Sequence, residues 1–572
     1  MNVFRELAQA VRAALREATD GVVAGLEAPA AGVELPRDPA HGDFATNAAM
    51  TAARAARMNP RVLAEGLSER LRADARFASV EVAGPGFVNL RMTPEFWRTQ
   101  IPVILKAGAA YGDSDIGAAR RVNVEYVSAN PTGPLHVGHA RGAVFGDALA
   151  RLLTRAGYDV TTEYYINDAG AQVDALARSV HHRYLEALGE GPGPMAADMY
   201  PGEYLKPLGA VLAEEFGPRW RDADEAAWLF TFRERAVAAM MAAIREDLAA
   251  AGIEQQVFTS ERALVDAGGV ERAIAGLEQK GLVYWGILDP PKGKKPDDWE
   301  PGRRQLLFRS TEAGDDVDRP LKKSDGGWTY FASDIAYHMD KAARGFEDLI
   351  DVWGADHGGY VKRMQAAVTA ATAARLNVKI CQLVRVLRGG DMVRMSKRSG
   401  DFVTLREVVD EVGRDALRFL MLTRRNDAPL DFDLAQAVAQ SRENPVFYVQ
   451  YAHARCCSVL RHGEDIGEAS AEDLARLEEP EELELIRRLA AWPHTVETAA
   501  AAHEPHRAAF YLMEAATDFH ALWTKGRETA RLRFIQDDDP VGTRARLALV
   551  RATAIVLAGG LRTLGIEPTE RM

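Results

Sequence analysis

Residues 122–139, VNVEYVSANPTGPLHVGH, predict a strand, a tight loop and the start of a helix. Apolar residues alternate with others through the first six positions, which is strand periodicity, and the PTGP sequence that follows can continue neither a strand nor a helix. Apolar residues then recur at helical spacing from Ala140 until Gly157, a residue typical of a helix C-terminus. A second strand is expected over 160–166. Together these elements predict a βαβ unit of a parallel sheet.

Two histidines flank one glycine at the start of this helix. His136, Gly138 and His139 are expected at the positive end of the helix, above the carboxyl edge of the sheet, where nucleotide phosphates bind. The glycine permits close approach of an adenine or ribose, and both imidazoles could donate hydrogen bonds to phosphate oxygens during attack on an α-phosphate. The structural alternative is that one histidine caps the helix and the other packs in the core. The loop context favours the nucleotide site.

A glycine-bounded basic loop, GGDMVRMSKRSG, occupies residues 389–400. Thr404 and Glu407 follow with the spacing of a capping box, which predicts a helix over Leu405–Val412. A cationic loop between glycines can close over a triphosphate and neutralise the leaving pyrophosphate, with Lys397 as a mobile point charge. Considered alone, such a run is more often a solvated turn.

The sequences HVGH and MSKRS together resemble the two signature sequences of class I aminoacyl-tRNA synthetases, and their surroundings resemble the arginyl-tRNA synthetase family. The resemblance covers nearly the whole chain. The first signature departs from the family pattern only by valine for isoleucine, and the second has Arg394 and Arg398 where the pattern has lysine and serine. The other matching segments are HGDFATNAAM, GPGFVNL, EYYINDAGAQ, TYFASDIAYHMDK, GADHGGYVKRM, RDALRF, NPVFYVQYAHAR and LGIEPTERM.

This resemblance implies an enzyme that joins L-arginine to tRNA(Arg) in two steps, with arginyl-adenylate as the intermediate and pyrophosphate as the first product. It implies that activation needs bound tRNA, and that His136, His139 and Lys397 are catalytic. Mg²⁺ is expected to accompany the ATP without a dedicated metal cage. The implied ATP-binding residues are His136, Gly138, His139, Met395, Ser396 and Lys397.

A pocket for arginine must recognise a guanidinium, which is planar, permanently charged and carries five donors. Such a pocket needs carboxylates placed for forked hydrogen bonds and an aromatic wall. The resemblance places Glu125 and Asn130 at the α-amino end of arginine, and Tyr330 and Asp334, four residues apart on one helical face, at its side chain. For Glu125 and Asp334 the alternative is a salt-bridged structural carboxylate. A site of this kind rejects, in one step, arginine analogues that lack the paired donors of a guanidinium, so no editing domain is required.

Four further positions match family sites. Asp356 and His357 fall where the family lines the arginine pocket, although the sequence does not decide which of them faces inward. Phe87 and Asn89 match positions that hold an unstacked loop base of the tRNA elbow. The alternative for this second pair is a core aromatic with a turn-side amide.

The expected fold is multidomain α/β: a Rossmann-type parallel-sheet catalytic domain with an α+β N-terminal domain and an all-α C-terminal helical bundle. Short strands over 80–83 and 87–92 and a surface excursion over 289–304 are part of this prediction. The helical section resembles the DALR anticodon-binding domain, named for a motif at 415–418. The expected domains are 1–110, which binds the tRNA elbow, 111–400, catalytic with an insertion, 401–440, a connecting helical segment, and 441–572, the DALR domain.

The composition is that of an ordinary globular protein, with 572 residues, 47% of them hydrophobic and 27% charged. No apolar run approaches the ~18 residues that a membrane span needs, and the expected first helix, over about 1–26, carries acidic residues, unlike a transit peptide. We therefore expect a cytoplasmic protein without membrane contact, and a monomer. The formal net charge of -12 argues against indiscriminate coating of nucleic acid but not against a specific RNA partner.

Two alternatives stay open. The first is another class I synthetase with a DALR domain, such as the cysteinyl enzyme, which relies on a zinc-thiolate pocket. Cys381, Cys456 and Cys457 form no CxxC pair, so we expect no zinc. The second is a non-catalytic RNA-binding paralogue, or a nucleotidyltransferase that uses HxGH on a small cofactor. The intact signatures argue against the paralogue, and the long helical tail argues against the transferase.

Overall fold

The computed structural model describes residues 2–19, 32–36, 38–288, 302–393, 403–441 and 443–572. The chain forms two compact units. Met1–Ser114 and Ser441–Met572 make up the first unit, and Asp115–Gln440 makes up the second. Among the helices in these described ranges, none combines the length and the apolar character needed to cross a membrane.

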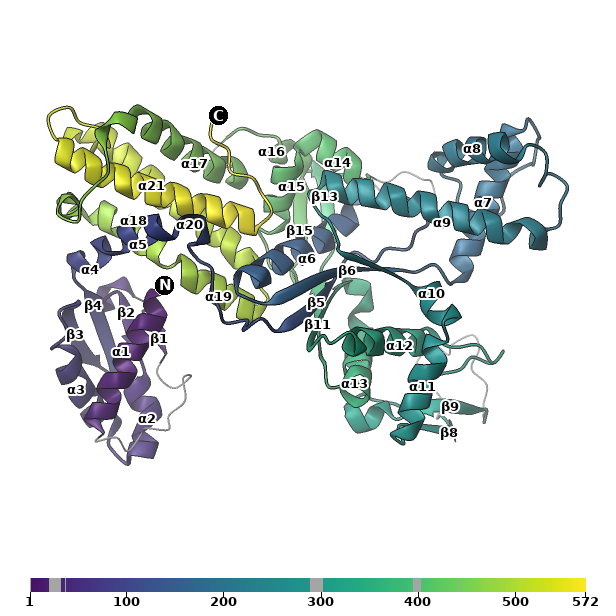
Figure 1. Ribbon diagram of the computed structural model, residues 1–572, viewed down its shortest axis with the longest axis horizontal. Coiled ribbons are helices and arrows are strands. Elements are labelled where there is room, and N and C mark those ends of the chain that lie inside the picture. The colour runs from purple at the N-terminus through teal and green to yellow at the C-terminus, as the bar shows by residue number, and fades with distance from the viewer. Residues whose placement is uncertain (1, 20–31, 37, 289–301, 394–402, 442) are drawn as a thin grey trace. The chain divides into compact units, whose positions relative to one another are not determined.

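A five-stranded parallel sheet forms the centre of the second unit (Figure 1). Its strand order is β12, β11, β5, β6, β7, and every neighbouring pair is parallel. Because the chain builds outward from β5 on one side and from β11 on the other, the order reverses between these two strands. The crevice at such a switch point is the usual ligand site of an open α/β sheet. The strands are β5 (Arg121–Glu125), β6 (Asp159–Ile166), β7 (Val257–Ser260), β11 (Asp348–Gly354) and β12 (Arg375–Cys381).

The βαβ unit predicted from residues 122–139 is confirmed. The loop after β5 leads into α6 (Val137–Arg155), and Gly157, with a φ of 86°, follows that helix before β6 begins. From its second residue onward, β5 is buried at polar and apolar positions alike. The reason is that α6 covers one face of the sheet, while α12 (Tyr330–Ala343) and α13 (Val361–Ala371) cover the other (Figure 1).

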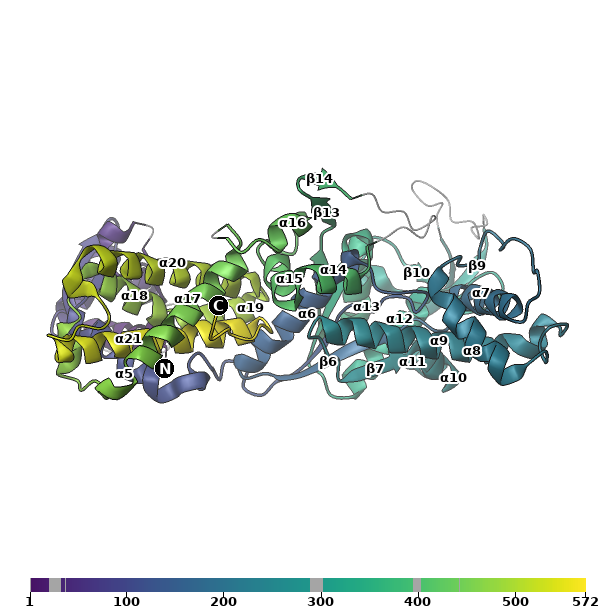
Figure 2. The ribbon, with the colours of Figure 1, turned by 90° about the horizontal axis from the view of Figure 1, so that it is seen from above.

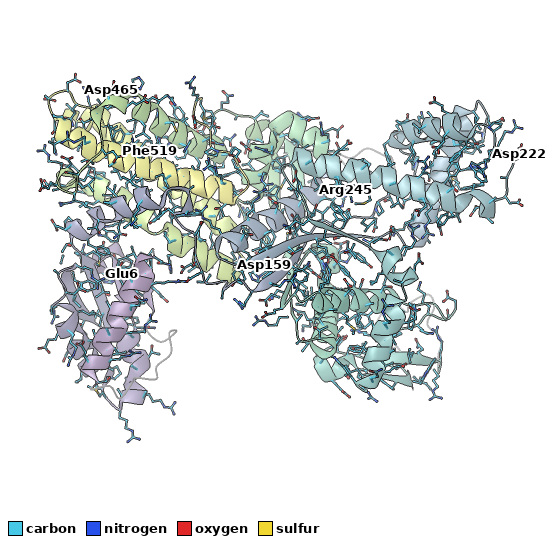
Figure 3. The ribbon with its side chains drawn as sticks, in the orientation of Figure 1. Glu6, Asp159, Asp222, Arg245, Asp465 and Phe519 are labelled. Atoms are coloured by element: carbon cyan, nitrogen blue, oxygen red, sulfur yellow. The ribbon has the colours of Figure 1, made fainter. Side chains whose placement is uncertain are left out.

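Two insertions interrupt the path between the sheet strands. The first contains α7 (Ala171–Ala187), α8 (Lys206–Phe216) and α9 (Glu225–Ala250), which pack together at one end of the unit (Figures 1 and 2). Arg245 of α9, labelled in Figure 3, lies 4.0 Å over the ring of Phe258 in β7, which ties the insertion to the sheet edge.

The second insertion contains α10 (Glu261–Asp266), α11 (Gly269–Gln279) and a small antiparallel sheet. That sheet has the order β10 (Arg319–Pro320), β9 (Arg304–Phe308), β8 (Val283–Ile287). Most of the predicted surface excursion, 289–301, lies outside the described residues. Its last residue, Arg304, begins β9 and so belongs to a strand.

The end of the second unit contains another small sheet, with the order β14 (Asp391–Met392), β13 (Val384–Arg388), β15 (Leu430–Asp433). The predicted capping box at α14 (Leu405–Val412) is confirmed: the Glu407 amide donates to the Thr404 hydroxyl at 3.1 Å, and the Thr404 amide donates to the Glu407 carboxylate at 2.8 Å. The last helices of this unit are α15 (Arg414–Met421) and α16 (Leu434–Ala437).

The N-terminal part of the first unit is α+β. Its antiparallel sheet has the order β1 (Val33–Glu34), β2 (Phe44–Thr46), β4 (Phe87–Met92), β3 (Phe77–Ala83), packed with α1 (Val3–Ala18), α2 (Ala48–Ala56) and α3 (Pro60–Leu71). The strands predicted over 80–83 and 87–92 are confirmed as an antiparallel pair, with β3 starting earlier than expected, at Phe77. The expected first helix is too long at its C-terminal end, because α1 ends at Ala18 with Thr19 as its cap, and residues 20–31 lie outside the description.

Two short helices, α4 (Pro94–Arg98) and α5 (Gln100–Ala107), follow this sheet. The described part of 441–572 contains helices and no strand: α17 (Pro445–His462), α18 (Pro480–Ala490), α19 (Trp492–Ala502), α20 (His506–Glu528) and α21 (Pro540–Thr563). Their core includes Phe519, labelled in Figure 3, whose ring stacks on Phe534 at 5.8 Å. The predicted fold class is therefore confirmed, whereas the domain boundaries at 110, 400 and 440 stay predictions.

Candidate functional site

The two signature histidines form a reciprocal cap at the start of α6. His136 Nδ1 accepts a hydrogen bond from the Gly138 amide at 3.0 Å, and His139 Nδ1 accepts one from the His136 amide at 3.2 Å. The rings stack with centroids 3.8 Å apart, and a Cβ on Gly138 would lie 2.8 Å from the His136 ring. Because each Nδ1 accepts, a neutral imidazole carries its proton on Nε2. Capping and donation to a ligand are therefore compatible roles.

The segment after the second signature lies directly beside the first signature. The Val137 amide donates to the carbonyl of Val403 at 3.0 Å, and the Leu405 amide donates to the carbonyl of Leu135 at 2.8 Å. The fold thus brings residues 135–137 next to residues 403–405. The predicted Met395, Ser396 and Lys397 lie outside the described residues, as do Arg394 and Arg398.

Glu125 ends β5 and is held by two donors. The Ser128 hydroxyl donates to Oε1 at 2.9 Å and Lys341 Nζ donates to Oε2 at 2.5 Å, while Ser128 Oγ itself accepts from the Tyr165 amide at 3.0 Å. Val127 and Ser128 have φ angles of 72° and 38°, and a β-branched residue in this region is strained. This turn brings Ser128 back onto the carboxylate. Burial raises the pKa of Glu125, against the effect of Lys341.

Four side chains relevant to the site come from α12. Tyr330, at its start, is 58% exposed, and Asp334 accepts a hydrogen bond from the Tyr360 hydroxyl at 2.7 Å. Burial raises the pKa of Asp334 to about 6. About one turn and two turns further along, His338 and Lys341 are both buried. Tyr360 could not be predicted as a partner of Asp334 from the sequence, because the two residues lie far apart along the chain.

A second carboxylate, Glu261, lies near Asp334 and was not among the predicted site residues. Glu261 begins α10 directly after β7 and is buried. Burial, and then the charges of Asp334 and Asp168, raise its pKa to about 7. Asp168 in turn accepts hydrogen bonds from the Ser260 hydroxyl at 2.7 Å and the Arg262 amide at 2.9 Å. The position of Glu261 at the carboxyl end of a parallel strand was an available signal, but no spacing rule connects it to Asp334.

Three predicted arginine-pocket residues are more exposed. Asn130 Nδ2 donates to the side chain of Gln172, in the first turn of α7, at 2.8 Å. Asp356 and His357 lie in the 3-10 turn Ala355–Tyr360 after β11. Their side chains are 83% and 61% exposed and approach within 3.6 Å of each other. The structure thus brings half-buried Asp334 near two buried carboxylates, Glu125 and Glu261, and leaves Asp356 and His357 at the surface.

In the first unit, β4 directs Phe87, Asn89 and Arg91 to one face, because burial alternates along the strand. Phe87 is 41% exposed, so it is not a core aromatic, and Asn89 is half-buried. Within the ranges that the structure describes, no group of three or more His, Cys, Asp or Glu side chains is arranged to hold a metal ion.

Three family models match the chain: the arginyl tRNA synthetase N terminal domain over 5–92, the catalytic domain of class I (R) tRNA synthetases over 100–192, and the DALR anticodon binding domain over 449–572. The chain is 57% identical to the arginine--tRNA ligase of Parvibaculum lavamentivorans and 56% identical to that of Ruegeria pomeroyi, over 100% of both chains in each comparison. The chain belongs to the arginyl-tRNA synthetase family. The arginyl-tRNA synthetase structure from Thermus thermophilus, 23% identical over 100% of both chains, has the same fold, with a TM-score of 0.71.

In this arginyl-tRNA synthetase family member, the 415–418 motif does not lie in the region that matches the DALR domain. The match to the DALR domain begins at 449, whereas this motif lies in α15, within the second unit. Arg418 is fully buried, pairs with Asp147 of α6, and donates to the carbonyls of Ala251 at 3.1 Å and Gly252 at 3.3 Å. The motif therefore lies outside the helical domain that carries its name, and its arginine holds the signature helix in place.

Proposed function

We propose that this protein ligates L-arginine to tRNA(Arg) at the expense of ATP, through an arginyl-adenylate intermediate. The observation that carries the proposal is the pair of carboxylates formed by buried Glu261 and half-buried Asp334, at the carboxyl end of the sheet whose switch point also holds the histidine signature. Two like charges held in a buried site raise each other's pKa, and a cation with several donors relieves that repulsion. A guanidinium has this chemistry.

The first step is attack of the arginine carboxylate on the α-phosphate of ATP. A new P–O bond forms to the carboxylate, the bond to the β-phosphate oxygen breaks, and pyrophosphate leaves. His136 and His139, each with its proton on Nε2, donate to phosphate oxygens as negative charge builds, which is electrostatic stabilisation rather than base catalysis. In the second step the terminal ribose hydroxyl of tRNA attacks the arginyl carbonyl, and AMP leaves with the hydroxyl proton passing to solvent.

Within this pocket we assign Glu125 and Asn130 to the α-ammonium of arginine, and Asp334 and Tyr330 to its guanidinium, with Glu261 added on the basis of its burial beside Asp334. Asp356 and His357, both exposed, are assigned to the rim. The nucleotide is assigned to His136, Gly138 and His139, and the sequence adds Met395, Ser396 and Lys397 from the second signature.

The exposed face of β4 supports a tRNA contact for Phe87 and Asn89, because an aromatic ring and an amide can stack on and hydrogen-bond an unstacked base. We also propose that Mg²⁺ accompanies the ATP, since it is bound mainly through phosphates and water. We propose further that the chain has the four predicted domains. We also propose that the protein works in the cytoplasm and as a monomer.

Attachment of each of the twenty amino acids to bulk tRNA, with and without ATP, tests this function. We expect ATP-dependent incorporation of arginine and of no other amino acid. Incorporation of a different amino acid would identify another synthetase, and the absence of any incorporation with intact protein and tRNA would favour a non-catalytic RNA-binding protein.

Arginine binding is expected to weaken as the pH falls through about 7 and then about 6. Burial raises the pKa of Glu261 to about 7 and that of Asp334 to about 6, and only the ionised carboxylates attract the guanidinium. Below these values a proton competes with the ligand, so the KM for arginine should rise about tenfold per pH unit for each carboxylate that must ionise. Steady-state kinetics at saturating ATP give this KM. In Asp334→Asn the step near pH 6 should disappear. If the arginine KM of the unmodified enzyme does not depend on pH, the assignment of Asp334 and Glu261 to the guanidinium is wrong.

A further inference from the structure

Three carboxylates form a row across the middle of the parallel sheet. The strand register places Glu125 of β5 directly opposite Asp351 of β11 on one side and Glu163 of β6 on the other. All three are buried. Residues opposite each other on neighbouring strands direct their side chains to the same face, and like charges in such positions repel. The row is therefore unstable without cations.

The cations that pair with the row are Lys341 of α12 and Arg344, the residue that caps the C-terminus of α12. Lys341 Nζ lies 2.5 Å from Glu125 Oε2 and 3.1 Å from Asp351 Oδ1, and Lys341 is completely buried. Arg344 donates to both oxygens of Glu163 at 2.9 Å. Lys341 is therefore the cation that bridges Glu125 to Asp351, whereas Arg344 pairs with Glu163 at the end of the row.

One further side chain of α12, His338, pairs with the row. His338 Nε2 lies 2.8 Å from Asp351 Oδ2, and its Nδ1 lies 2.7 Å from the Asp334 carbonyl oxygen. Burial opposes charge on both members of this pair, but their mutual attraction raises the pKa of His338, and Lys341 and His338 lower the pKa of Asp351. The charged groups around Glu125 are therefore Lys341, His338 and Asp334 on α12, Asp351 on β11 and Glu163 on β6.

Glu125 depends on Lys341 more than its neighbours do. Burial already raises the pKa of Glu125, Asp351 raises it further, and Lys341 is the strongest influence that lowers it. Its other donor, the Ser128 hydroxyl, is neutral. Removal of the ammonium would leave Glu125 facing Asp351 across the strands, and the least costly response is to take up a proton. A protonated Glu125 has no charge with which to attract an ammonium group.

We infer that Lys341 is a positioning residue of the arginine pocket, which holds the Glu125 carboxylate in place and ionised so that it can receive the α-ammonium of the substrate. This inference rests on the proposed function, in which Glu125 binds that ammonium. Lys341 is completely buried, so we assign it no contact with the substrate. The effect of Lys341 is exerted through Glu125. Lys341 and Asp334 lie on the same helix, α12, so this helix contributes to both ends of the proposed pocket.

The test compares Lys341→Met with Arg344→Met in arginine-dependent exchange of pyrophosphate into ATP, with tRNA present. Both changes remove a cation of the row, but only Lys341 touches Glu125. In Lys341→Met the KM for arginine should rise at least about 30-fold, with little change in the KM for ATP. In the pH profile of the arginine KM, the step that reports protonation of Glu125, as distinct from the steps of Glu261 and Asp334, should move upward by about one unit or more; this step is the acid limb that the test follows. Arg344→Met should lower the melting temperature without moving that limb.

A second variant separates positioning from packing. Adding Asp351→Asn to Lys341→Met removes the repulsion that raises the pKa of Glu125, so the acid limb should move back toward that of the unmodified enzyme. If Lys341 only packs α12 onto the sheet, the double variant is less stable and the limb stays where it was in every variant, which overturns the inference. Lys341→Gln, which keeps a donor, replaces the methionine variant if the latter does not fold.

These outcomes are distinct from failure of the proposed function. Absence of arginine-dependent exchange in the unmodified enzyme overturns the proposed function. Normal exchange in the unmodified enzyme, together with an unchanged arginine KM and pH profile in Lys341→Met, overturns the role of Lys341 alone.

Discussion

Alanine in place of His136 or His139 is expected to slow adenylate formation by about 10² to 10³-fold for each residue, with little effect on the binding of arginine. The physical reason is that a donor aimed at charge that develops only in the transition state contributes to kcat rather than to ground-state binding. Each Nδ1 is occupied by a backbone amide, which leaves Nε2–H as the donor of the neutral ring. Single-turnover formation of arginyl-adenylate, monitored by quenched flow, gives the rate directly.

Both histidines also cap α6, so the alanine variants need a control for lost helix stability. His136→Asn keeps a side-chain acceptor that can cap the helix but removes the Nε2 donor. If catalysis depends on the donor, the asparagine variant should be as slow as the alanine variant while its melting temperature stays closer to that of the unmodified protein. A full rate in the asparagine variant would show that the histidine serves only as a cap.

The second large effect is expected for Asp334→Asn. This change keeps the size of the side chain and an oxygen that can accept from the Tyr360 hydroxyl, but it removes the charge that we assign to the guanidinium. The kcat/KM for arginine should fall by an amount equivalent to ~2 to 5 kcal/mol, the usual cost of breaking a buried charge pair. Discrimination against citrulline, the neutral isostere of arginine, should shrink at the same time, because citrulline loses less from the missing charge.

Glu125→Gln is the matched comparison, since it neutralises a carboxylate at the other end of the pocket. Citrulline and arginine share the same α-ammonium, so this variant should weaken both substrates equally. Measurement of kcat/KM for both substrates in both variants separates the two ends. An unmodified arginine-to-citrulline ratio in Asp334→Asn would exclude Asp334 from the guanidinium end.

The features that could be predicted from the amino-acid sequence are those that local chemistry determines. The strand, loop and helix of residues 122–139 follow from periodicity and from proline and glycine in the loop, and the capping box of Thr404 and Glu407 forms between residues three positions apart. These interactions need only the few residues around them. The family and its reaction could be predicted for a related reason, because the two signatures are short, specific and present together.

Other features were decided only by the tertiary structure. The row formed by Glu163, Glu125 and Asp351 exists because of the sheet register, and Lys341 reaches it because α12 packs on that face. The burial of Glu261 beside Asp334 likewise depends on where β7 ends in the sheet. No residue spacing encodes these contacts, since they join distant positions through the order of strands and the packing of helices. The sequence alone therefore determined the local elements, the family and the candidate residues, while the folded chain decided which charges meet, how deeply they are buried and which cation each carboxylate depends on.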